Sequence, residues 1–126
     1  MKNKTVLLVD DDPVFVETTR IALENDFNII TACDGDECME RIEKEMPDLI
    51  LLDVMMKHLG EGVDISEKLK KAEKTKNIPV IMLTGVSKIY DMSTITDQST
   101  YNHSDLWLEK PVDSEKLLED VKRLIR

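Results

Sequence analysis

The feature of this sequence that most constrains its fold is a series of five short apolar runs. The runs are Val6–Val9, Phe27–Ala32, Leu49–Leu52, Ile78–Leu83 and Leu106–Leu108. Their short length and their aliphatic or β-branched content are typical of strands. The second to fourth runs lack a clean alternation of apolar and polar residues, which predicts strands that are buried on both faces of a sheet.

The segments between these runs have the spacing of amphipathic helices. Asp12 and Asp113 stand where an N-cap is expected, Pro13 suits a first helical position, and Pro47 ends the second helix. Mostly apolar residues three and four apart fall on one face of each helix, which predicts its buried side. These residues are Val14, Thr18, Ile21, Ala22 and Asn25, beside Phe15; Cys38, Met39, Ile42 and Met46; Ile65, Leu69 and Ala72; and Leu117, Leu118, Val121, Leu124 and Ile125.

Alternating strands and helices predict parallel strands joined by right-handed crossovers. The fold class is therefore α/β, a doubly wound parallel sheet with helices on both faces. In such sheets ligands bind beyond the carboxyl ends of the strands.

Polar side chains stand at those strand ends. The first run leads into Asp10-Asp11-Asp12, the third into Asp53, the fourth into Thr84, and the fifth is followed by Lys110. If the first and third strands are neighbours, Asp10, Asp11 and Asp53 share one pocket. Carboxylates that close repel, so that either one holds a proton or a cation neutralises them.

A hard divalent ion with oxygen ligands, Mg²⁺ above all, suits such a pocket. A metal ion, a lysine and a hydroxyl around one carboxylate describe a site for a phosphoryl group, with the carboxylate as its acceptor. Taken singly, Thr84 and Lys110 have ordinary structural explanations, and Asp53 could cap a turn. Asp12 is expected to serve as the helix N-cap rather than as a ligand. The joint placement at successive strand ends favours a functional site.

At this point the sequence resembles the receiver domain of two-component response regulators over essentially its whole length, residues 1–126. The matching stretches are Val6-Leu-Leu-Val-Asp-Asp-Asp-Pro13, Pro47-Asp-Leu-Ile-Leu-Leu-Asp-Val-Met-Met56, Pro79-Val-Ile-Met-Leu-Thr-Gly85 and Trp107-Leu-Glu-Lys-Pro111. Each stretch alone is a weak signal, and all four in this order are highly specific. The resemblance implies a flavodoxin-like sheet of five strands in the order 2-1-3-4-5.

The resemblance also implies a role for each matching residue. Asp53 would accept a phosphoryl group from a phosphohistidine on a sensor histidine kinase or a histidine phosphotransfer protein. The Mg²⁺ ligands would be Asp10, Asp11, Asp53 and the backbone carbonyl of Met55. Thr84 and Lys110 would bind phosphoryl oxygens, and the Lys110-Pro111 bond would be cis. Thr84 and Trp107 would form the conformational switch that controls an unknown output partner or the pairing of two phosphorylated copies.

The sequence departs from the common receiver pattern in four places. Lys57 replaces a frequent proline, and the loop 57–62 is one residue longer than usual. The stretch between Thr84 and Lys110 is also longer, and its part 87–104 is polar with little helical stripe, which predicts a short, shifted or mobile fourth helix. Trp107 is bulkier than the usual switch aromatic residue.

Composition narrows the classes of partner. The net charge of −9 argues against direct contact with nucleic acid or an anionic membrane surface and suits a soluble cytoplasmic protein. No apolar run approaches the roughly 20 residues that span a bilayer. Cys33 and Cys38 match no zinc or redox spacing and are expected to be two semi-buried thiols in a reducing compartment.

Two other readings remain open at this stage. An aspartate-nucleophile phosphatase could use Asp10 as nucleophile with Asp12 two residues on, but this leaves Asp53 unexplained. A receiver-like module that only binds partners would not need all five site residues. The leading hypothesis is a signalling phosphoacceptor rather than an enzyme that turns over a substrate.

Overall fold

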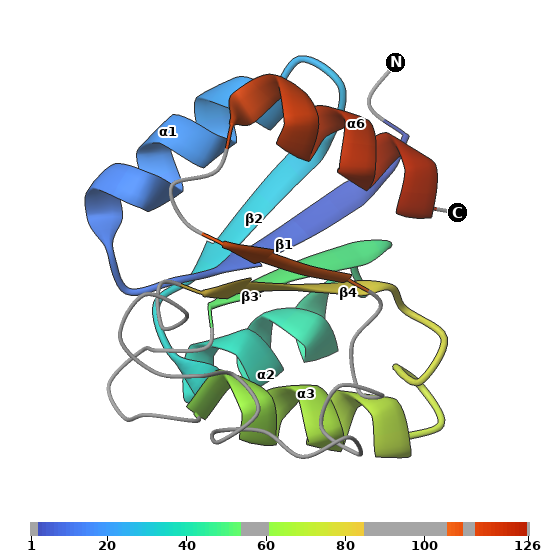
Figure 1. Cartoon of the computed structure of the whole chain (residues 1–126). Helices are drawn as coiled ribbons and strands as arrows, with labels where there is room; N and C mark the ends of the chain where they lie inside the picture. Colours follow the sequence, from blue (N-terminus) through green and yellow to red (C-terminus); the bar gives the residue numbers. More distant parts are fainter. Residues whose placement is uncertain (1–2, 54–60, 85–105, 110–112, 126) are drawn as a thin grey trace.

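The structure, a computed structural model, describes residues 3–53, 61–84, 106–109 and 113–125 (Figure 1). Its strands are β1 (Thr5–Val9), β2 (Asn28–Ala32), β3 (Leu49–Asp53), β4 (Val80–Thr84) and β5 (Leu106–Glu109). Its helices are α1 (Pro13–Leu23), α2 (Gly35–Lys44), α3 (Glu61–Lys71) and α6 (Ser114–Leu124). All neighbouring strands pair in parallel, and the sheet order is β2-β1-β3-β4-β5. The predicted fold class and strand order are confirmed.

Helices cover both faces of the sheet. In Figure 1, α1 and α6 lie together on one face, and α2 and α3 lie on the other. The side chains of β1 alternate between the two layers, because successive residues of a strand point to opposite faces. Val6 and Leu8 pack in the layer under α1 and α6, whereas Leu7 and Val9 pack in the layer under α2 and α3.

The central strands are buried on both faces, as predicted, but β2 is not. Every residue of β3 is buried, and so are residues 80–83 of β4; β1, outside that prediction, is buried as well. In β2, Asn28 is exposed and Ile29, Ile30 and Thr31 are half-buried. The prediction for this run was wrong because β2 lies at the edge of the sheet, with β1 as its one partner among the described strands. An unbroken apolar run does not distinguish a central strand from an edge strand.

The predicted buried face of α1 was also wrong. Val14 and Ile21 are 74% and 55% exposed, and Thr18 and Asn25 are exposed as well. The helix instead buries Thr19 and Leu23. Phe15 and Val16 pack partly against the same layer. The segment carries two competing apolar stripes, and the larger residues of the second stripe fill the space over the sheet.

The other helices follow the predictions in part. Cys38 and Ile42 of α2 are buried, but Met39 and Met46 are exposed. Ile65 and Leu69 of α3 are buried, whereas Ala72 is exposed beyond the helix end. In α6, Leu117 and Val121 are buried and Leu118, Leu124 and Ile125 pack partly against the core. Asp12 and Asp113 cap α1 and α6 by accepting the N–H groups of Val14 and Glu115, as predicted.

The two cysteines differ from the expectation of two semi-buried thiols. Cys33 is exposed, whereas Cys38, on the inner face of α2, is fully buried. Burial raises the pKa of the Cys38 thiol to about 12. Cys38 therefore behaves as a small apolar core residue. Among the described residues no helix is long and apolar enough to cross a membrane.

Leu51 lies at the centre of the sheet, between Leu8 of β1 and Ile81 of β4, and is fully buried. We expect Leu51→Ala to lower the free energy of unfolding by about 3 kcal/mol, because it removes buried methyl groups and leaves a cavity. Urea denaturation followed by circular dichroism measures the change. Val14→Ala, which truncates an exposed side chain, is the control, and an equal loss in both variants would contradict the assigned burial.

Candidate functional site

The site begins where β1 ends. The backbone N–H of Asp10 donates to the carbonyl of Ala32 at 3.0 Å, which extends the pairing with β2 by one residue. The Asp10 side chain is buried, and its Oδ1 accepts the backbone N–H of Asp12 at 2.9 Å. Asp11 lies between them and is exposed to solvent. One acid is thus held inward and its neighbour is open to approaching groups.

The second part of the site is the end of β3. Asp53 is the last residue of this strand and is buried. Because β1 and β3 pair with Val9 beside Leu52, the residues that follow, Asp10 and Asp53, lie beside each other. Carboxylate oxygens of Asp10, Asp11 and Asp53 lie within 4.8 Å of one another.

The arrangement of these three carboxylates defines what the site can do chemically. Three acids at this separation repel one another, and two of them are buried, so a cation between them would offset unfavourable charge. Their donor set is carboxylate oxygen alone, which suits a hard divalent ion such as Mg²⁺. The residues present therefore fit such an ion.

The remaining expected site residues lie only partly within the described structure. Thr84 is the last residue of β4, and Asp53 pairs with Leu83, so the backbone of Thr84 stands one position further along the same edge of the sheet. Trp107 belongs to β5, and its backbone pairs with that of Met82 in β4. Met55, Lys110 and the Lys110-Pro111 bond lie outside the described residues, as do Lys57 and the stretch 87–104. Their expected roles stay predictions.

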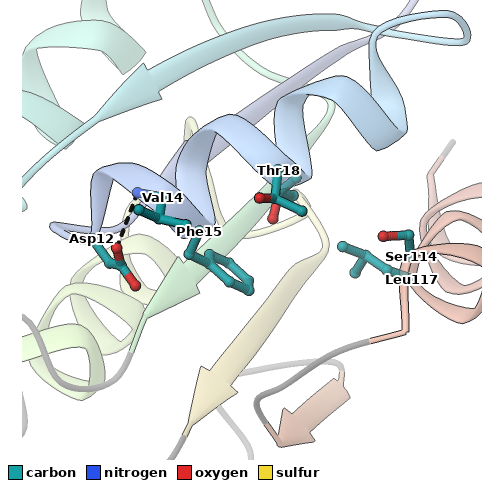
Figure 2. A pocket seen from close by; sticks show the side chains of 7 residues that line it. Asp12, Val14, Phe15, Thr18, Ser114 and Leu117 are labelled. Carbon is teal, nitrogen blue, oxygen red and sulfur yellow. Dashed lines mark hydrogen bonds between the residues drawn. The ribbon is translucent and has the colours of Figure 1, made fainter.

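Asp12 does not join the three acids. Its Oδ1 accepts the backbone N–H of Val14 at 3.0 Å and so caps α1 (Figure 2). This cap disfavours the hypothesis of an aspartate-nucleophile phosphatase, which needs Asp12 as a reacting group. That reading also leaves Asp53 without a role, although Asp53 lies against Asp10.

Sequence reasoning missed a groove that begins at Asp12. Its volume is about 240 Å³, and it lies between the start of α1 and α6. Figure 2 shows Phe15 and Thr18 of α1 on one side of it, with Ser114 and Leu117 of α6 across from them. Val14, Thr18 and Ile21 form an exposed stripe along α1 (the α1 stripe). The available signal was the presence of two apolar stripes on one helix, of which only one can face the core.

Comparison with known protein families shows which family has this arrangement of three acids. Residues 6–122 match the model of the response regulator receiver domain. The chain belongs to this family. Receiver domains of two-component response regulators act in signal transduction as phosphoacceptors, which agrees with acids gathered at the carboxyl edge of the sheet.

Curated relatives support the same family. The DNA-binding dual master transcriptional regulator RpaA of Synechocystis is 34% identical over 122 residues, which are 96% of this receiver chain and 48% of the relative. The alkaline phosphatase synthesis transcriptional regulatory protein PhoP of Bacillus subtilis is 31% identical over 125 residues, which are 98% and 49% of the two chains. The receiver chain spans about half the length of these relatives.

Solved structures resemble this receiver in fold and, at 28% identity, in sequence. A CheY-like response regulator receiver domain protein from Methanospirillum hungatei has a TM-score of 0.77 and 28% identity, and the match covers 95% of this chain and 91% of that one. The response regulator TrrA from Thermotoga maritima has a TM-score of 0.80 and 28% identity, with 97% and 99% covered. That TrrA structure is a complex with Mg²⁺ and BeF.

Proposed function

We propose that residues 1–126 act as one receiver domain that accepts a phosphoryl group on Asp53 in a Mg²⁺-dependent reaction. The observation that carries this proposal is the approach of Asp10, Asp11 and Asp53 within 4.8 Å at the carboxyl edge of the sheet. The Mg²⁺ complex of TrrA, a relative with the same fold, supports the choice of ion. Asp10, Asp11, Asp53 and the backbone carbonyl of Met55 would hold the ion, which supplies positive charge toward the transferring oxygens.

The acceptor step follows from the chemistry of Asp53. One oxygen of its carboxylate attacks the phosphorus of a phosphohistidine, so that a P–O bond forms while the P–N bond breaks. The electron pair of the broken bond stays on the imidazole. The Thr84 hydroxyl and the Lys110 ammonium would bind the phosphoryl oxygens as charge spreads over them. The dephosphorylated histidine protein departs and the phosphoryl group stays on Asp53, so the domain serves as a signalling acceptor, with autodephosphorylation as its own further reaction.

The response to phosphorylation would begin at Thr84 and Trp107. A phosphoryl group adds up to about two negative charges, which must draw nearby donors toward it. Thr84 and Trp107 stand on the adjacent strands β4 and β5. An output partner, or a second phosphorylated copy of the chain, would read their rearrangement.

The molecules that contact this domain directly are expected to be proteins. RpaA is named as DNA-binding, but the matched region is only 48% of its length. For residues 1–126 the net charge of −9 disfavours direct contact with nucleic acid or an anionic membrane. We therefore propose proteins of the cytoplasm as the direct partners: a sensor histidine kinase or a histidine phosphotransfer protein as donor, and an output protein.

The experiment that tests this function is phosphorylation by a small donor. The purified chain is incubated with acetyl phosphate and Mg²⁺, and intact mass spectrometry follows the addition of one phosphoryl group. Peptide mapping after reduction of the acyl phosphate identifies the modified residue. Modification at a residue other than Asp53, or equal modification in excess chelator, would overturn the assignment.

The α1 stripe is the surface over which we expect the donor protein to approach. The phosphohistidine must come within bonding distance of Asp53, so the donor has to cover the surface around Asp11 and the start of α1. Val14 is 74% exposed there, and Ile21 is 55% exposed two turns further along the helix. Exposed apolar side chains that lie together on one helix face are a feature of surfaces that contact other proteins.

We expect the double variant Val14→Ala, Ile21→Ala to lower kcat/KM for transfer from a phosphorylated sensor kinase by about tenfold, since truncating an interface anchor costs more than about 1 kcal/mol. Labelling by acetyl phosphate should not change. The kinase is one that phosphorylates the unmodified chain. Met39→Ala, Met46→Ala is the matched control, because it truncates two exposed apolar residues on the opposite face of the sheet. A tenfold loss in the control, or none in the α1 variant, would contradict this docking surface.

A further inference from the structure

We infer that Asp12 is a positioning residue for the cation site: by capping α1 it fixes the backbone N–H group that orients the Asp10 carboxylate. This inference rests on the proposed function, since it concerns how the proposed Mg²⁺ ligands are held. It assigns Asp12 a task beyond stabilising a helix end. Asp12 acts through Asp10 and contacts no ion itself.

Two hydrogen bonds in series connect the helix to the site. The first runs from the backbone N–H of Asp12 to Oδ1 of Asp10, at 2.9 Å. The second runs from the backbone N–H of Val14 to Oδ1 of Asp12, at 3.0 Å. The Asp12 carbonyl also accepts the N–H of Val16 at 3.0 Å, the first hydrogen bond of this helical turn. Asp12 is therefore tied to the first turn of α1 by its side chain and by its backbone.

The consequence for Asp10 follows from its position. The residue is 1% exposed, so water has little access to orient its carboxylate. Its backbone is fixed by the hydrogen bond to Ala32, and one carboxylate oxygen is fixed by the N–H of Asp12. If the cap on α1 is lost, the connection 10–12 gains freedom at its helical end. The Asp10 carboxylate then loses one of the fixed groups that orient it.

A pair of substitutions separates this positioning role from a simple charge effect. Asp12→Ala and Asp12→Asn each remove one negative charge, but only asparagine can still cap the helix, where it is about as effective as aspartate. We expect Asp12→Ala to weaken Mn²⁺ binding by about tenfold, as loss of a group that orients a metal ligand commonly does. We expect Asp12→Asn to bind Mn²⁺ within about twofold of the unmodified chain. Electron paramagnetic resonance of free Mn²⁺, without any phosphodonor, gives the dissociation constants.

Asp113→Ala provides the matched control for helix capping. Asp113 caps α6 by accepting the N–H of Glu115 at 3.1 Å, and its loss removes the same charge and the same type of cap from a different helix. It should lower the thermal unfolding midpoint to a similar degree as Asp12→Ala while leaving Mn²⁺ affinity unchanged. This control distinguishes loss of the Asp10 orientation from general loosening of the fold.

The outcomes are distinguishable. Unchanged affinity in Asp12→Ala would overturn the inference and leave the proposed function intact. Equal weakening in Asp12→Ala and Asp12→Asn would also overturn it, because the charge of Asp12 would then matter and the cap would not. Failure of the unmodified chain to bind Mn²⁺ would overturn the proposed function, and the inference with it.

Discussion

Asp53→Asn is expected to abolish phosphorylation of this chain by acetyl phosphate in the presence of Mg²⁺. Asparagine has nearly the shape of aspartate, so it can occupy the buried position at the end of β3. Its amide oxygen carries no full negative charge and is a poor nucleophile toward phosphorus. Labelling measured by intact mass should fall to the background level of the chelated sample.

The control for this variant is Asp36→Asn, which removes one carboxylate from an exposed position on α2, outside the three acids. It should be labelled as well as the unmodified chain. Circular dichroism should show that Asp53→Asn remains folded. Undiminished labelling of Asp53→Asn at another residue would contradict Asp53 as the acceptor.

The convergence of the acids could be predicted from sequence because it depends on topology more than on packing detail. Parallel strands place their carboxyl ends at one edge of a sheet, so residues that follow two neighbouring strands must meet there. Asp10 follows β1 and Asp53 ends β3, and these two strands are neighbours. The caps at Asp12 and Asp113 could be predicted because they depend only on local hydrogen bonds.

The orientation of α1 could not be predicted, for a physical reason. Its residues offer two apolar stripes, one containing Val14 and Ile21 and the other containing Phe15 and Leu23. Hydrophobic spacing cannot decide between them, because the choice depends on which side chains fill the space over the sheet. The stripe left outside, which begins at Val14 beside the cap residue Asp12, is the one for which we propose a functional role. The partial exposure of β2 escaped prediction similarly, because its apolar run looks like that of a central strand although the expected strand order places it at the edge.

The three acids also predict a conflict between stability and function. Asp10 and Asp53 are 1% and 3% exposed, and their carboxylate oxygens lie within 4.8 Å of each other and of an oxygen of Asp11. Without a cation, the repulsion between them is a cost that the fold has to bear. Functional sites commonly retain such costs, and substitutions that relieve them stabilise the protein at the expense of activity.

We therefore expect Asp10→Asn to raise the free energy of unfolding of the metal-free chain by about 1–2 kcal/mol. The asparagine side-chain oxygen can still accept the N–H of Asp12, so the turn before α1 is retained. The same variant should lose most of its response to Mg²⁺. For the unmodified chain, an ion that binds only the folded state adds about 1.4 kcal/mol at ten times its dissociation constant.

Urea denaturation in chelator and in saturating Mg²⁺ measures both effects in one experiment. Asp36→Asn again serves as the control, because it changes the net charge equally at an exposed position away from the site. It should match the unmodified chain in its response to Mg²⁺. If Asp10→Asn were less stable than the unmodified chain in chelator and were stabilised equally by Mg²⁺, Asp10 would be a structural residue of the turn rather than a ligand. The opposite result, a more stable chain that no longer responds to Mg²⁺, would connect the charge of this site directly to its function.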